Sequence, residues 1–275
     1  MEPLPFNFHR TFKPERAYIG KILTYAALQK EGTIQEIAAE TGIPTGVSSG
    51  KVEPTIDYAV GMGLVTLAAS EGKVRKPRLT PFGIAVLSND PNLGYELTQW
   101  LAHMNLCRSD IGAAAWHALF ARGRSQLGAC FSKAQLKRYL VEKFGSSGKK
   151  PGPLITTYSD EYSLDKTKAL VEEEGGRLVR KKAPTLDVYG ASYSAMILTL
   201  MDSFFPDDDQ VSFCDFNELT GWFDVCLWDQ PDLELAFSAI ERKGHIIVDR
   251  HRRPWILERN NSAAAVWPTI YDDMA

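Results

Sequence analysis

Two stretches of this 275-residue chain carry the same order of short elements, and that order constrains the fold more than any other feature. In the first stretch, apolar residues at helical spacing predict a helix over residues 18–30. Thr33 and Glu36 form a capping box that starts a second helix, for which Gly42 is the expected C-cap. A third helix is predicted over residues 54–61, followed by a strand, a basic loop and a returning strand. This is the element order of a winged helix-turn-helix.

The last third of the chain repeats this order with almost no sequence identity to the first stretch. The expected helices cover residues 189–205, 216–227 and 231–243, and the expected strands cover residues 245–249 and 255–258. The turn between these strands holds His251 and three arginines, Arg250, Arg252 and Arg253. A DNA-contacting wing needs cations at its tip to bind phosphates.

The middle of the chain is expected to be helical. Helices are predicted over residues 93–107, 110–120, 133–144 and 165–174, and residues 145–153 form the clearest break. The predicted fold class is therefore mainly α with small β-hairpins (α+β), as tandem winged helix-turn-helix modules joined by a helical middle region. The predicted domains are residues 1–90, 91–184 and 185–275.

Composition excludes several classes of protein. With 44% hydrophobic and 24% charged residues, the chain can bury a core and should not be disordered. No run of 18 apolar residues predicts a membrane span, and the N-terminal residues lack the apolar region of a signal peptide. The four cysteines lie far apart without a CxxC, which argues against a zinc finger or a disulfide framework. We therefore expect a cytoplasmic protein with no membrane partner.

Basic residues gather at the places where a winged helix meets DNA, although the net charge of −3 alone gives no reason to expect nucleic acid. Before the third helix, a glycine-rich turn offers free amides, two hydroxyls and a lysine for a phosphate. The predicted DNA-binding residues are Ser48, Ser49, Lys51, Arg75, Lys76, Arg78, Arg250, Arg252 and Arg253. Two alternatives stay open: these clusters are solvated loops, or the modules dock proteins instead of DNA.

The glycine-rich turn is not expected to bind a nucleotide. A Walker A loop needs glycine where this chain has Thr45, and Ser or Thr where it has Val52. No nucleotide or organic cofactor is therefore expected.

Several acidic residues and histidines resemble metal ligands or catalytic residues, but each also fits a purely structural role. Asp232 and Glu241 match the PD…ExK pattern of metal-dependent nucleases, but on a single helix they would point to opposite faces. The acids at 207–209 are ligands that Mg²⁺ accepts, and they equally suit a solvated turn. His103 and His117 have apolar neighbours and are expected to be core residues. No catalytic residue or metal ligand is predicted.

His9 lies in a polar cluster with Arg10, Glu15 and Arg16, inside an otherwise apolar N-terminal strip. Two interpretations remain open. His9 could act as a general base with the arginines as phosphate clamps. Alternatively, the cluster holds the N-terminal arm onto the first helix.

Three stretches together have an unusual sequence: residues 8–16, residues 41–64 with their glycine-rich centre, and residues 79–83 followed by 100–106. In combination they resemble the bacterial family called domain of unknown function 4007. That family is associated with DNA phosphorothioation, in which sulfur replaces a non-bridging phosphate oxygen.

The resemblance implies double-stranded DNA as a partner, together with a cysteine desulfurase, an ATPase and a sulfurtransferase. A member of this type is implicated in nicking DNA so that sulfur can enter, which implies a metal-dependent endonuclease using Mg²⁺ or Mn²⁺. A homodimer is a further expectation. The alternatives are a non-catalytic winged-helix transcription regulator and a protein-binding adaptor.

Overall fold

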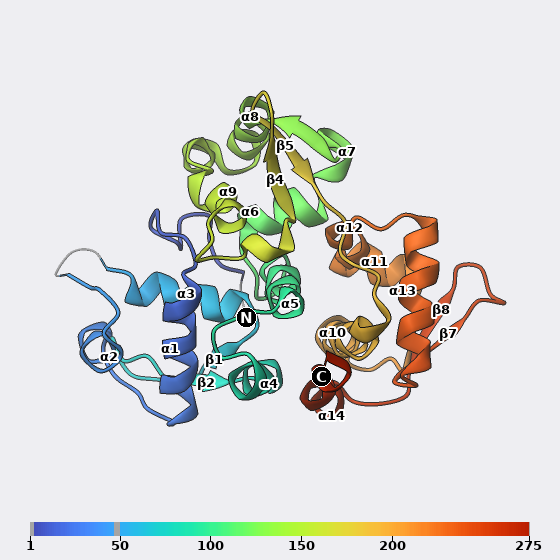
Figure 1. Ribbon diagram of the computed structural model, residues 1–275, viewed down its shortest axis with the longest axis horizontal. Coiled ribbons are helices and arrows are strands. Elements are labelled where there is room, and N and C mark those ends of the chain that lie inside the picture. The colour runs from blue at the N-terminus through green and yellow to red at the C-terminus, as the bar shows by residue number, and fades with distance from the viewer. Residues whose placement is uncertain (1–2, 47–49, 275) are drawn as a thin grey trace. The chain divides into compact units, whose positions relative to one another are not determined.

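The computed structural model describes residues 3–46 and 50–274 (Figure 1). The chain divides into two compact units, Met1–Lys181 and Lys182–Ala275. Among the described residues the fold is α+β, with helices and three small antiparallel sheets. None of the described helices combines the length and the apolar character needed to cross a membrane.

The first unit begins with the elements expected for its N-terminal part, which are α1 (Arg16–Ala27), α2 (Ile34–Thr41), α3 (Val52–Gly61), β1 (Val65–Leu67) and β2 (Pro77–Leu79). A helix that was not predicted, α4 (Pro81–Asn89), follows them. The capping box is confirmed, because the Thr33 hydroxyl accepts from the Glu36 amide while the Glu36 carboxylate accepts from the Thr33 amide. Gly42 ends α2 in the left-handed conformation, at φ 63°.

The rest of the first unit alternates helices with short strands. Its elements are α5 (Glu96–Leu106), α6 (Ala114–Trp116), a π-helical turn (His117–Ala121), α7 (Arg124–Leu127), β3 (Cys130–Ser132), α8 (Lys133–Phe144), a 3₁₀ turn (Gly145–Lys149), α9 (Gly152–Ser159), a second 3₁₀ turn (Asp165–Thr167), β4 (Leu170–Glu173) and β5 (Arg177–Arg180). The middle region is therefore not purely helical.

The helix predicted over residues 165–174 is wrong. After one 3₁₀ turn the chain forms β4, which pairs with β5 in an antiparallel hairpin. The physical reason lies in the loop, where Gly175 and Gly176 both have positive φ, 81° and 75°. Two adjacent residues in this region favour a tight hairpin turn over a helix end.

The second unit contains α10 (Gly190–Phe204), β6 (Gln210–Ser212), α11 (Phe213–Thr220), α12 (Trp222–Cys226), α13 (Gln230–Arg242), β7 (Ile246–Asp249), β8 (Ile256–Arg259) and α14 (Ala263–Val266). The single helix expected over residues 216–227 is divided in two, because Gly221 adopts φ 64° at the end of α11. Strand β6 was not expected, and it adds a third strand to the predicted hairpin.

The same connectivity occurs in both three-stranded sheets. In each, a strand is followed by helices and then by a hairpin, and the first strand pairs with the last: β3-β5-β4 in one and β6-β8-β7 in the other. The middle part thus has the same strand order as the C-terminal part. The sequence does not show this similarity, because the residues of β4 were predicted to be helical.

The N-terminal arm is part of the core of the first unit. The Phe8 ring packs edge-on against Tyr58 of α3, with centroids 4.7 Å apart, and lies 5.9 Å from the Trp116 ring. The Tyr58 hydroxyl donates to the carbonyl oxygen of Phe12 at 3.0 Å. These contacts hold the arm against α3 and α6.

Candidate nucleic-acid interface

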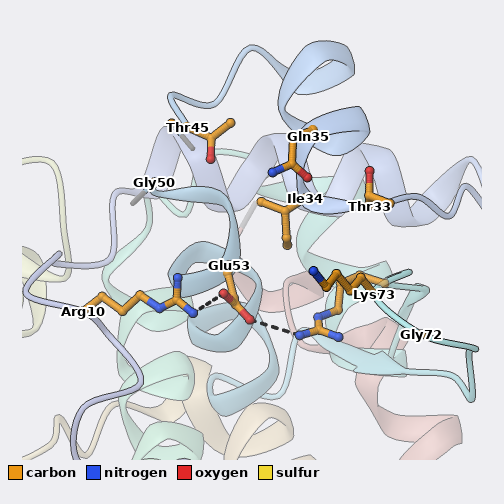
Figure 2. Close-up of a pocket in the computed structure, with 11 residues that line it drawn as sticks. Arg10, Thr33, Ile34, Gln35, Thr45, Gly50, Glu53, Gly72 and Lys73 are labelled. Atoms are coloured by element: carbon orange, nitrogen blue, oxygen red, sulfur yellow. Dashed lines mark hydrogen bonds and ion pairs between the residues drawn. The ribbon is translucent and has the colours of Figure 1, made fainter. Parts of the chain in front are cut away.

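A cavity of about 390 Å³ lies where α2, α3, the β1–β2 hairpin and the N-terminal arm meet (Figure 2). The start of α2 supplies Thr33 and Gln35, and the turn before α3 supplies Thr45 and Gly50. The other lining residues are Arg10, Ile34, Gly46, Glu53, Gly72, Lys73 and Arg75. Among the described residues, Arg75 is the one predicted DNA-binding residue that lines this cavity.

Glu53 lies between two arginines in this cavity. Its carboxylate forms an ion pair with Arg10 from the arm and accepts from Nη2 of Arg75 at 3.0 Å, as the dashed lines in Figure 2 show. One helical turn further along α3, Asp57 has its pKa raised to about 7, first by burial and then by the charge of Glu53. Glu53 and Asp57 were not predicted as a pair. Their four-residue spacing on a predicted helix nevertheless indicates that the two carboxylates lie on the same face.

Lys51 precedes α3, but its charge is bound internally. Its Nζ lies 2.6 Å from Oε1 of Glu15 and over the rings of Phe12 and Tyr18, 5.9 and 5.2 Å from their centroids. The hydrogen bond that Lys51 donates to Glu15 raises the pKa of Lys51, so the lysine stays charged. Ser48 and Ser49, predicted beside it, lie outside the described residues.

The remaining predicted cations of the first hairpin also have partners. Nζ of Lys76 lies 2.8 Å from Oε2 of Glu31, and Nη1 of Arg78 donates to the carbonyl oxygen of Lys30 at 3.0 Å. In contrast, Lys73 is exposed and forms no ion pair with the residues that the structure describes. The positive charge offered to a ligand is therefore smaller than the number of cations suggests.

The C-terminal hairpin combines one bound arginine with two exposed ones. Arg250 pairs with Glu241 of α13, and its guanidinium lies 5.3 Å from the Trp255 ring centroid. The Arg252 side chain is 67% exposed, with Nε 3.3 Å from Oδ2 of Asp249. Arg253 is exposed, and the described part of the chain offers it no ion pair. Arg252 and Arg253 are thus the most accessible of the predicted cations.

The nuclease-like pattern on α13 is used for helix capping and ion pairs. Asp232 bonds reciprocally with the N-cap Asp229, and both carboxylates accept from Nζ of Lys182 at 2.6 Å. Glu241 binds Arg250 near the other end of the same helix. Within residues 3–46 and 50–274, no three His, Cys, Asp or Glu side chains gather as metal ligands.

Two histidines, His9 and His103, are buried. Burial lowers the pKa of His9 to about 4 and that of His103 to about 3. A 2.6 Å hydrogen bond joins Nδ1 of His103 to the Tyr158 hydroxyl, and Nδ1 of His117 donates to the carbonyl oxygen of Cys107. His103 is therefore a core residue, as expected, whereas His117 is half-buried and is held by its hydrogen bond to Cys107.

Comparison with known proteins gives a match in fold. No family model matches the chain, and no curated protein matches its sequence. Two solved structures share its fold over 98% of this chain and 87% of theirs. One is described as a magnesium ion-bound SspB crystal structure, with a TM-score of 0.69 and 13% identity. The other is an SspB crystal structure, with a TM-score of 0.64 and 14% identity. The chain is thus similar to SspB in fold along nearly its whole length.

Proposed function

We propose that this chain is the SspB-like, DNA-binding component of a DNA phosphorothioation system and that it nicks DNA for sulfur insertion. The observation that carries the proposal is the fold shared with SspB over 98% of the chain. The resemblance of residues 8–16, 41–64, 79–83 and 100–106 to domain of unknown function 4007 points to the same process. Its expected partners are double-stranded DNA, a cysteine desulfurase, an ATPase and a sulfurtransferase.

DNA binding is assigned to winged helices. The strand order of the two three-stranded sheets, with helices before a terminal hairpin, supports this assignment for the middle and C-terminal parts. In the N-terminal part, α1 to α3 followed by the β1–β2 hairpin supports it as well. The two basic wings are those at residues 73–78 and 250–253, whereas the β4–β5 hairpin carries Glu172 and Glu173 at the end of β4 and Glu174 in its turn. An acidic tip would repel phosphates.

The two basic wings differ in how readily they can bind a phosphate. Arg252 and Arg253 need to break few contacts. Arg75 and Lys76 would have to exchange Glu53 and Glu31 for phosphate. We therefore assign the larger share of the binding free energy to the C-terminal wing.

A divalent metal would not find a complete ligand set on the protein alone. Glu53 and Asp57 lie one turn apart, but two arginines lie beside them and no third ligand lies within reach among the described residues. Mg²⁺ is commonly held by one or two carboxylates together with substrate phosphates. The metal requirement is therefore tested with DNA present.

The decisive experiment incubates purified protein with supercoiled plasmid and with Mg²⁺, Mn²⁺ or EDTA. We expect open circles with either metal and none with EDTA. If plasmid is retarded but uncut in all three conditions, the proposed nicking activity is wrong, and the protein is a DNA-binding regulator. Absence of both retardation and nicking at about 100 mM salt, where phosphate-driven binding persists, would overturn the proposal and favour a protein-binding adaptor.

A further inference from the structure

A second cavity of the first unit, about 370 Å³, lies between the N-terminal arm and residues 146–153. Asn7, His9 and Arg10 of the arm line it, together with Ser146, Ser147 and Lys150. Its described lining contains no Asp or Glu. With Thr11, the lining holds two cations, three hydroxyls and an imidazole without any carboxylate, which is a donor set for an anion and not for a metal ion.

Arg10 lines this cavity and also the one that contains Glu53. The backbone that places it there is unusual, because Arg10 and Thr11 have φ of 46° and 77°. Non-glycine residues in this region cost about 1 kcal/mol each and persist where the surroundings enforce them. The arm is therefore held in a conformation that makes one arginine common to two neighbouring cavities.

His9 offers a hydrogen-bond donor at this place. Its Nδ1 accepts from the backbone amide of Thr11 at 3.1 Å. The ring packs against Phe6, Phe8 and Trp116, and this burial keeps it neutral. A neutral imidazole whose Nδ1 accepts carries its proton on Nε2. Nε2–H is thus the group that His9 has left to donate, which disfavours the general-base interpretation.

The loop on the opposite side supplies charge and hydroxyls. Asn7 donates to Oγ of Ser147 at 3.1 Å, which ties the loop to the arm and leaves the hydroxyl proton of Ser147 available. Lys150 is exposed, and no carboxylate of residues 3–46 or 50–274 pairs with it. Its charge is therefore available to a ligand.

We propose that this cavity binds a phosphate group of nucleic acid, with Lys150 supplying the charge that no carboxylate neutralises, Arg10 adding to it from its ion pair with Glu53, and the Ser146 and Ser147 hydroxyls and His9 Nε2–H supplying hydrogen bonds. The inference rests on the proposed function for the source of that phosphate. The proposed phosphate subsite neighbours the cavity that contains Glu53, and Arg10 lines both cavities. The DNA path in this unit would then extend past the wing to the loop at residues 146–150.

The test follows the imidazole nitrogens of His9 by NMR in ¹⁵N-histidine-labelled full-length protein. Inorganic phosphate is the first probe, and a saturable shift of the His9 Nε2 signal is expected. Lys150→Ala should weaken this binding by about tenfold, the effect of losing one charge-assisted contact. Lys149→Ala is the matched control, because Lys149 is also exposed but does not line the cavity, and it should change binding less than twofold. No saturable shift, or equal effects of the two substitutions, would overturn the proposal.

Oligonucleotides then identify the source of the phosphate. Tighter binding of a 5′-phosphorylated strand than of its unphosphorylated form, measured at His9, assigns the cavity to a strand end. Equal binding assigns it to an internal phosphodiester. If plasmid is retarded while the His9 signals do not move, this subsite is wrong and the proposed function stands. If phosphate moves His9 while plasmid is not retarded, the proposed function fails and the anion site stands.

Discussion

Nη2 of Arg75 lies 3.0 Å from Oε1 of Glu53, so a cation that the sequence assigns to DNA is bound by a carboxylate at the start of α3. Arg10 binds the other oxygen of the same carboxylate. Glu53 thus lies between two arginines. If DNA binds here as we propose, a phosphate would replace the Glu53 carboxylate, and the free energy of binding would depend on how tightly Glu53 competes.

Removing the charge of Glu53 should strengthen DNA binding. Glu53→Gln frees Arg10 and Arg75 while keeping the side-chain shape, so affinity should rise several-fold and the slope of log K against log salt should steepen by about one to two. Fluorescence anisotropy with a labelled duplex at several salt concentrations measures both. Glu40→Gln is the control, because it removes an exposed negative charge that pairs with Lys30 outside the cavity. An equal gain in both variants would mean that only the net charge matters.

The exposed arginines of the C-terminal wing should carry much of the salt dependence. Replacing Arg252 and Arg253 by Ala removes two phosphate contacts, so the same slope should fall by about two and affinity by at least tenfold. Arg242→Ala is the matched control, because Arg242 is an exposed arginine at the end of α13 that pairs with Asp187. A slope that stays unchanged in the double variant would remove the wing from the interface.

Asp57 should make stability depend on pH. Its folded-state pKa of about 7 lies above the ordinary value of 3.8, so the folded state binds more protons between these values. The contribution of Asp57 to the free energy of unfolding therefore falls as pH rises from about 4 to about 7, while His9 and His103, whose folded pKa values are lowered, contribute in the opposite direction. Asp57→Asn removes this titration. Its stability relative to wild type should grow by about 2 kcal/mol between pH 5 and pH 7, measured by urea denaturation. The buried histidines titrate in both proteins and cancel in the difference, so a constant difference would contradict the buried-carboxyl interpretation.

Tyr158 should matter for stability and not for DNA binding. Tyr158→Phe removes the hydroxyl bonded to Nδ1 of the fully buried His103, which should cost about 1–3 kcal/mol of unfolding free energy. Tyr162→Phe is the control, because that side chain is 64% exposed and its loss should be within 0.5 kcal/mol, roughly the range of surface substitutions. If Tyr158→Phe lowered DNA affinity at unchanged stability, His103 would have to be assigned to the interface.

The sequence by itself determined the elements whose signals lie within one or two helical turns. The capping box of Thr33 and Glu36 starts α2, Gly42 ends it, and α8 covers the predicted residues 133–144. The hairpin that carries the C-terminal arginines also lies where its turn residues predict it. These features depend on hydrogen bonds and backbone preferences between near neighbours, which a linear pattern records.

Only the tertiary structure decided which short segments become strands and which cations stay free. Residues 130–132 and 210–212 are too short to show a period, and they are strands because β5 and β8 offer them backbone partners. Leu170–Glu173 pairs in the same way, against its helical appearance. Glu53 meets Arg75 across 22 residues and Glu15 meets Lys51 across 36. Such pairings depend on how the elements pack in space, and neither composition nor periodicity encodes that packing.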